Sequence, residues 1–229
     1  CYNNRPVKIA GSHAGVSVGP DGGTHQAIED IALMRVIPRM VVISPCDAIE
    51  ARKATIAAAK TDTPVYIRLA REKTPIITTE ETPFEIGKAR VLWSCRNQMS
   101  TERSDGVGIV ATGALVHRAI LAARELWEKE NIAVTVMNLS TIKPIDEEAV
   151  VSLAKETGAI VTVEEHQGAG GMGSAVAEVL ARRKPTPMEF VGVNDQFGQT
   201  GKPEELLEYY GIGTPHIKAA ALKLMGRRG

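Results

Sequence analysis

The sequence predicts an α/β protein of two domains, each a mainly parallel sheet with helices on both faces. Two observations carry this prediction. Short apolar runs alternate along the chain with segments whose apolar residues recur at helical spacing. Several of these runs are almost continuously apolar, as at residues 40–44, which is typical of strands in a parallel sheet that is buried on both faces.

The boundary between the domains is expected near residue 78, so that residues 1–78 form the first domain and residues 79–229 the second. Residues 72–84 contain two prolines and several threonines and show neither a helical nor a core pattern. They therefore indicate an extended connection. The two halves are alike in kind, but no sequence repeat relates them.

In the first domain the pattern predicts three strands that alternate with two helices. The strands are expected at residues 7–11, 40–44 and 64–71, and the helices at residues 24–37 and 48–60. Thr24 is the expected N-cap of the first helix, which Pro38 ends, and Asp47 is the expected N-cap of the second.

In the second domain the alternation continues with more elements. Strands are expected at residues 84–93, 107–112, 133–139, 159–164 and 188–193, and helices at residues 114–130, 147–156, 173–183, 203–210 and 215–225. The polar residues 97–106, between the first two of these strands, are expected to form a hairpin loop.

The composition narrows the classes of partner. Acidic and basic residues balance at 27 each, which argues against nucleic acid or an anionic membrane as the main partner. The sequence shows no apolar run near the ~20 residues of a membrane span and no signal segment at its start. The three cysteines, Cys1, Cys46 and Cys95, lack metal-ligand spacing. We therefore expect a reducing, cytoplasmic location.

A glycine-rich stretch, residues 11–26, follows the first expected strand. Glycine has no Cβ, so such a loop lets the backbone approach a ligand closely. The stretch also carries His13, Asp21 and His25, and a loop on a rigid scaffold is where binding and catalytic groups tend to lie.

Ligands of parallel sheets bind beyond the carboxyl ends of the strands. His13, Asp21 and His25 are expected at such an end, together with the Arg68 and Arg71 pair that follows the third strand. Imidazoles can shuttle protons, a carboxylate can fix a hydroxyl, and arginine suits phosphate. The set suits a phosphorylated, polyhydroxylated small molecule. The residues alone leave a second interpretation equally open, in which the loop is a turn with solvated histidines.

A second glycine-rich segment, residues 164–173, stands between an expected strand and an expected helix. A helix N-terminus there could hold a phosphate, but the glycine spacing is not that of a dinucleotide-binding fingerprint. A tight turn with close helix packing, or a subunit contact that includes His166, is the favoured interpretation.

The motifs of the first loop resemble those of the transketolase family, and the resemblance extends over nearly the whole chain. It is carried by residues 11–15, 19–26, 28–38, 45–47, 68–71, 141–146, 163–166 and 200–207. The combination of motifs is specific, although no single one would be convincing.

The resemblance implies a ketol transferase that moves a two-carbon unit from a ketose phosphate to an aldose phosphate with thiamine diphosphate and Mg²⁺. It implies that His25 is catalytic and moves a proton at the transferred unit, that Asp21 binds the C2 hydroxyl of the donor, and that His13 and Arg71 bind substrate, with Arg71 on the phosphate. The first domain would be the later part of a pyrimidine-binding domain, followed by the family's C-terminal domain.

The chain departs from the family in what it lacks. It has no Gly-Asp-Gly…Asn motif for the metal and diphosphate, and neither Glu29 nor Glu50 matches the glutamate that activates the cofactor. We therefore expect a truncated chain or one section of a split enzyme. It would act as a homodimer or with a partner N-terminal section that carries the diphosphate-binding domain. The isolated chain is expected to be inactive.

Two other interpretations stay open. Deoxyxylulose-phosphate synthases are similar around Asp21 to Gln26 but usually have an arginine where this chain has His13. A non-catalytic interaction module derived from the same fold would also lack the cofactor motifs.

Overall fold

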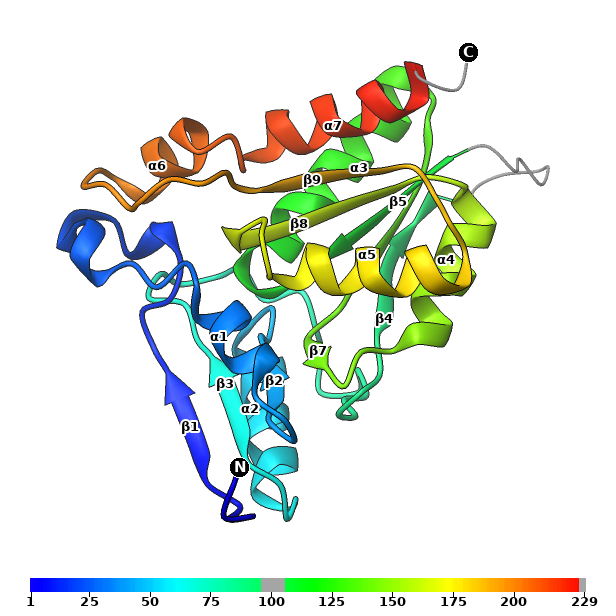
Figure 1. Cartoon of the computed structure of the whole chain (residues 1–229). Coiled ribbons are helices and arrows are strands. Elements are labelled where there is room, and N and C mark those ends of the chain that lie inside the picture. The colour runs from blue at the N-terminus through cyan, green and yellow to red at the C-terminus, as the bar shows by residue number, and fades with distance from the viewer. Residues whose placement is uncertain (96–105, 227–229) are drawn as a thin grey trace.

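The computed structural model describes residues 1–95 and 106–226. It contains a four-stranded sheet with the order β1-β3-β2-β7 and a five-stranded sheet with the order β4-β6-β5-β8-β9. Helices flank both sheets (Figure 1). The prediction of a two-sheet, mainly parallel α/β protein is confirmed.

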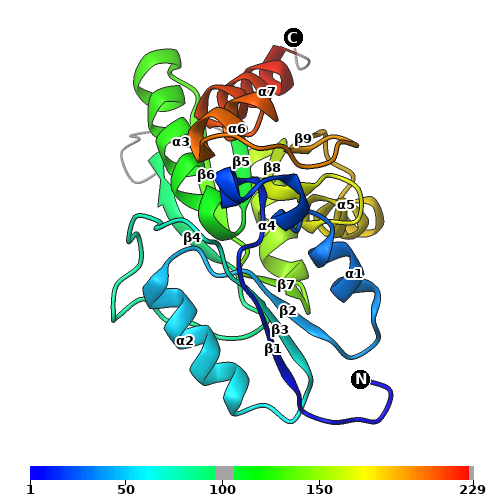
Figure 2. The ribbon, with the colours of Figure 1, turned by 90° about the vertical axis from the view of Figure 1, so that its left-hand side faces the viewer.

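The first sheet is built from β1 (Lys8–Gly11), β2 (Val41–Ile43) and β3 (Val65–Arg68), with β3 parallel to both neighbours. Its residues alternate between two buried faces. Val41, Ile43, Val65 and Ile67 pack with the alanines of α2 (Ala48–Ala59), whereas Val42 and Tyr66 pack with Ile31 of α1 (Asp30–Val36). The two helices therefore cover opposite faces of this sheet (Figure 2).

A fourth strand of the first sheet comes from the second half of the chain. β7 (Thr141–Lys143) pairs antiparallel with β2, with Val42 opposite Lys143. The sequence analysis did not predict this strand, because three residues are too few to show a period. β7 joins the two halves of the chain through backbone hydrogen bonds, so the first sheet contains residues from both sides of the expected boundary. The boundary at residues 78 and 79 stays a prediction.

The first predicted helix is wrong at its start. It was expected from residue 24, but α1 begins at Asp30, and Gln26 is extended with φ −91° and ψ 106°. Ala27 accepts a hydrogen bond from the Gly15 amide at 2.8 Å, so the backbone here pairs with the preceding loop instead of coiling. The end of the helix is confirmed, since Ile37 is already extended before Pro38.

The second sheet has β4 (Arg90–Ser94) antiparallel at one edge and four parallel strands: β5 (Gly106–Ala111), β6 (Ala133–Asn138), β8 (Ile160–Gln167) and β9 (Met188–Val193). The expected strand at residues 84–93 starts later, because a turn with Gly87 at φ 86° precedes it. Most of the expected loop at residues 97–106 lies outside the described residues, and Gly106 already belongs to β5.

The helices of the second domain are α3 (Val116–Glu130), α4 (Glu147–Thr157), α5 (Met172–Arg183), α6 (Pro203–Tyr209) and α7 (Thr214–Gly226). α3 and α7 lie together on one face of the sheet, and α4 and α5 lie together on the other (Figure 1). Ala119, Ala122, Ala123 and Leu126 are buried at intervals of three and four residues, which is why α3 presents one apolar stripe to the sheet.

The connection between the domains has no helix or strand at residues 72–84, as predicted. It is held along α2 instead. The Asp47 carboxylate accepts hydrogen bonds from the amides of Ile77 at 2.9 Å and Thr78 at 2.6 Å. The Lys53 ammonium donates to the carbonyl groups of Thr79, Glu80 and Thr82. No helix in the described part of the chain is long and apolar enough to cross a membrane.

Candidate functional site

The glycine-rich loop leaves the carboxyl end of β1 and folds into 3-10 turns at Val16–Asp21 and Gly23–His25. Gly15, Gly19 and Gly22 have φ of 93°, 70° and 89°, a region that favours glycine. At Gly23 a Cβ would lie 2.3 Å from the carbonyl oxygen of Gly198. The loop is therefore glycine-rich at least partly because it approaches its own second domain.

The side chain of Gln26 holds this loop together and ties it to the second domain. Its side chain is 7% exposed, and its Nε2 donates to the carbonyl oxygens of Val16 at 3.0 Å and Gln199 at 2.8 Å. One bond crosses the loop and the other crosses to the segment before α6, which packs on the loop (Figure 1). Sequence reasoning assigned Gln26 to a motif but gave it no role, because both of its partners are carbonyl groups that the sequence does not distinguish.

Asp21 and Arg71 meet at the rim of the first domain. Arg71 Nε lies 3.1 Å from Asp21 Oδ2, and each side chain is about one-third exposed, at 33% and 35%. Arg71 Nη1 donates to Glu72 Oε1 at 2.6 Å. The loop after β1 and the segment after β3 were expected to converge, and this ion pair joins them directly.

His13 and His25 lie on the same loop, and both are exposed. His13 has a left-handed backbone with φ 59°. His25 Nδ1 lies 3.1 Å from the hydroxyl of Thr24. No hydrogen bond or ion pair of the described residues joins either imidazole to the Asp21–Arg71 pair. The four candidate side chains share one loop cluster, but only two of them touch.

Arg68 does not belong to this rim. Its side chain is 7% exposed, and its Nε donates to both carboxylate oxygens of Asp30, at 3.1 and 2.9 Å. Its Nη2 donates to the carbonyl oxygens of Ala27 at 3.1 Å and Glu165 at 2.8 Å. Arg68 lies at the end of β3, as the sequence indicates, but its side chain turns inward and fixes the contact between the domains.

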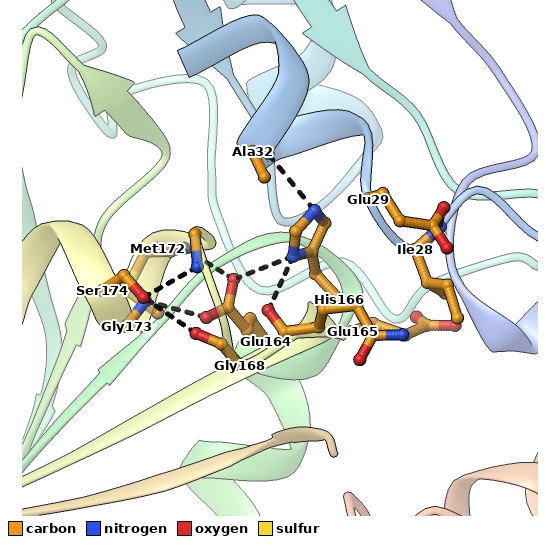
Figure 3. Close-up of polar contacts among 12 residues, drawn as sticks. Ile28, Glu29, Ala32, Glu164, Glu165, His166, Gly168, Met172, Gly173 and Ser174 are labelled. Atoms are coloured by element: carbon orange, nitrogen blue, oxygen red, sulfur yellow. Dashed lines mark hydrogen bonds and ion pairs between the residues drawn. The ribbon is translucent and has the colours of Figure 1, made fainter. Parts of the chain in front are cut away.

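His166 belongs to the same interface (Figure 3). It is fully buried, and its Nε2 accepts a hydrogen bond from the Ala32 amide at 3.4 Å, while Nδ1 lies 2.7 Å from the carbonyl oxygen of Gln167. Burial is the main cause that lowers the pKa of His166, with Arg68 contributing, so the ring stays neutral and can accept. It caps the first turn of α1 from the other domain, so its side chain packs within this chain, and a contact of this segment with a second subunit stays a prediction.

Glu164 occupies the amide groups of the second glycine-rich segment (Figure 3). Its carboxylate accepts hydrogen bonds from Met172 at 2.7 Å and Gly173 at 2.8 Å, at the start of α5. Burial raises the pKa of Glu164 to about 7, against the lowering effect of these two bonds. The segment is a tight turn with close packing, because its helix N-terminus is already filled by this chain's own carboxylate.

A metal site is not formed by the described residues alone. Across residues 1–95 and 106–226, no three or more His, Cys, Asp or Glu side chains are grouped so that they could hold an ion. The three cysteines are free thiols, and burial raises the pKa of Cys46. A magnesium ion that bridges a diphosphate needs only one or two protein carboxylates, so this finding concerns metal sites built from side chains alone.

Comparison with known families matches both halves of the chain. Residues 1–76 match the model of the transketolase pyrimidine-binding domain, and residues 96–217 match that of the transketolase C-terminal domain. The chain belongs to the transketolase family. Its sheets and loop cluster are thus those of two successive transketolase domains.

Relatives in this family include single sections of the enzyme. A putative transketolase C-terminal section of Methanocaldococcus jannaschii is 42% identical, over 98% of this chain and 68% of the relative. The 6-deoxy-6-sulfo-D-fructose transketolase subunit SqwH of Clostridium sp. is 40% identical, over 99% and 67%. A solved split-gene transketolase, described as an inactive beta4 tetramer, aligns with a TM-score of 0.87 and 44% identity, over 99% and 69%.

Proposed function

We propose that this chain is the substrate-contacting component of a transketolase that transfers a two-carbon ketol unit between ketose and aldose phosphates. The observation that carries the proposal is the Asp21–Arg71 contact at 3.1 Å, which brings a carboxylate and a guanidinium together on the exposed rim of the pyrimidine-domain sheet. Similarity to transketolase sections supports a component rather than a whole enzyme.

In this proposal Arg71 binds the phosphate of the sugar. Asp21 and Glu72 engage its Nε and Nη1, and no described residue bonds to its Nη2, which is left for a phosphate oxygen. Two flanking carboxylates also fix the plane of the guanidinium, so little side-chain entropy remains to be lost on binding. Asp21 accepts a hydrogen bond from a hydroxyl of the sugar next to its reacting carbon.

His25 is the proposed proton carrier. Thr24 holds its Nδ1 side, which leaves Nε2 to hydrogen-bond to the two-carbon unit and move a proton at its oxygen. His13 binds the sugar from the same loop. Thiamine diphosphate supplies the electron sink of this chemistry when it is bound. We propose that a partner section holds this cofactor, because the relatives of this chain include single sections of the enzyme.

The proposal is tested by mixing. The chain is purified alone and combined with an N-terminal transketolase section, thiamine diphosphate and Mg²⁺, and ketol transfer between two sugar phosphates is followed in a coupled assay. We expect turnover only in the mixture. Turnover by this chain alone would contradict its role as a component. Complex formation without any turnover would instead indicate a non-catalytic interaction module.

A further inference from the structure

A cavity of about 290 Å³ lies at the carboxyl edge of the second sheet. Its wall includes residues that follow β5 and the end of β8, the two neighbouring strands from which the chain runs to opposite sides of the sheet. β5 leads to β6 on one side, and β8 leads to β9 on the other. Such a reversal point is where open α/β sheets bind ligands. We refer to this space as the switch-point cavity.

Three separate parts of the chain enclose the switch-point cavity. Its wall carries His117 and Arg118 from the first turn of α3 and Glu165 from β8, and α6 borders it through Leu207. The first domain contributes Ser17 of the glycine-rich loop and residues 72–75 of the connection. The cavity therefore lies between the domains, and none of the four rim side chains proposed to contact the sugar lines it.

The inner wall of the cavity carries a buried hydroxyl and a buried carboxyl group. Ser17 is 6% exposed, and its Oγ, which interacts with the nearby Glu165 carboxyl group, makes no hydrogen bond of good geometry with the residues that the structure describes. The Ser17 amide donates to Glu165 Oε1 at 2.5 Å, and Glu165 is 3% exposed. Burial raises the pKa of Glu165. A buried polar group without a partner is uncommon in folded proteins, because the bond to water that it loses is not replaced.

The outer wall carries a free positive charge. Arg118 is paired with Glu204, and Glu72 is paired with Arg71. The Lys73 ammonium is exposed and has no ion-pair partner among the residues that the structure describes. The positive end of α3 lies on the same wall, since His117 and Arg118 belong to its first turn. An anionic group fits this end of the cavity, and a hydrogen-bonding hydroxyl fits the other.

We propose that the switch-point cavity is a second binding site, for a small hydroxylated anion such as a three-carbon phosphate monoester or hydroxy acid. Its anionic group lies against Lys73 and the start of α3, and its hydroxyl reaches Ser17 and Glu165. The volume is at the small end of the range for ligand pockets, which favours a three-carbon molecule over a nucleotide. The inference rests on the cavity and not on the proposed reaction.

Occupation of this site would act on the rim. Ser17 lies between His13 and Asp21 on one loop, and Lys73 follows Arg71 by two residues. A ligand that bridges Ser17 and Lys73 would hold the glycine-rich loop against the segment that follows β3. We therefore expect the ligand to restrict the motion of the sugar-contacting loop.

The test is calorimetric titration of the chain with glycerol 3-phosphate and with glycerate, with glycerol as the uncharged comparison. We expect saturable binding of at least one anion, a loss of roughly tenfold or more in affinity for Lys73→Met, and a smaller loss for Ser17→Ala. Lys73 is exposed, so its variant should fold. Lys184→Met, at the end of α5 on the far edge of the sheet, is the matched control.

The two anions distinguish a phosphate ester from a carboxylate as the anionic group that binds. Binding of the phosphate ester alone indicates a phosphorylated metabolite, and binding of glycerate alone indicates a hydroxy acid; either result supports the site. Arg71→Ala should keep saturable binding of the anion and weaken it less than Lys73→Met does, because it only frees Glu72 on the wall of the cavity. The proposal is overturned if neither anion binds, if Lys73→Met binds as tightly as the natural chain, or if Arg71→Ala abolishes binding, which would place the ligand at the rim.

Discussion

The guanidinium of Arg71 is oriented by two neighbouring carboxylates. Asp21 and Glu72 bind two of its nitrogen atoms, and the third has no bonded partner among the described residues. The pair with Asp21 is about one-third exposed on both sides, so it should contribute no more than about 1 kcal/mol to stability. The pair mainly orients the guanidinium of Arg71. A substitution of Arg71 should therefore leave the fold intact.

Arg71→Lys should separate orientation from charge. Lysine keeps the positive charge but loses the planar set of donors, so the assembled enzyme should show a KM for the phosphorylated donor raised roughly tenfold, with kcat changed less. The measurement is steady-state ketol transfer in the two-section mixture. Arg182→Lys, an exposed pair with Glu147, is the control. An unchanged KM would show that Arg71 does not bind the phosphate.

At the scale of elements, two helix N-caps also hold the connection between the domains. Asp47 caps α2 through its bond from the Glu50 amide at 2.8 Å, and the same carboxylate accepts from Ile77 and Thr78. Asp146 caps α4 through its bond from the Ala149 amide at 3.1 Å and accepts from Ala89 at 3.1 Å. Asp47 therefore holds the chain at residues 77 and 78, and Asp146 holds it at residue 89, just before β4.

Replacing these caps by alanine should have unequal effects. Asp47 is 4% exposed, so Asp47→Ala leaves several buried donors unpaired, and we expect a loss of about 2–4 kcal/mol in the free energy of unfolding. Asp146 is less buried and has fewer donors, so Asp146→Ala should cost about 1 kcal/mol. Urea unfolding measures both. Equal losses would show that the bonds from Ile77 and Thr78 add nothing to the cap of α2.

The elements that the sequence predicted well are those whose signal is local. The apolar run 188–193 became β9 with the same bounds, and Asp47 caps α2 as its side-chain chemistry requires. The start of α1 was missed because Ala27 and Ile28 fit a helical stripe, yet tertiary pairing with Gly15 keeps that backbone extended. Helical periodicity cannot reveal a competing bond from a distant loop.

The site divides in the same way. That the loop of Asp21 and the segment of Arg71 lie at one edge of the sheet follows from a rule about parallel strands, whereas the ion pair between the two side chains was not predicted. The interior position of Arg68, and the use of His166 as a cap for α1, depend on how the two domains pack. No spacing along the chain encodes that packing, so these roles became visible only with the structure.

At the scale of the whole molecule, the two domains are joined by a buried polar interface that includes Arg68 and Asp30. Glu164 and His166 belong to the same interface (Figure 3). Glu164 is 1% exposed and lies 4.0 Å from the ring of His166. Charge in such an interface is costly unless it is paired, so the protonation of Glu164 is linked to the stability of the folded chain.

The folded chain is more stable when Glu164 is protonated. The pKa of Glu164 is raised in the folded state to about 7 from its ordinary 4.5, so the folded chain binds this proton more tightly than the unfolded chain. Its contribution to stability is full below pH 4.5 and is lost as the pH rises to about 7, a loss of about 3 kcal/mol. Other groups add their own slopes, so only a comparison with a variant isolates this one.

Glu164→Gln should remove that slope. Glutamine resembles the protonated carboxyl group at every pH, so its free energy of unfolding should fall less than that of the natural chain between pH 5 and pH 8. Urea unfolding at several pH values gives both curves. Glu128→Gln, on the exposed side of α3, is the control and should follow the natural chain. Parallel curves for Glu164→Gln and the natural chain would mean that Glu164 is already ionised at pH 5, because the two bonds from α5 outweigh its burial.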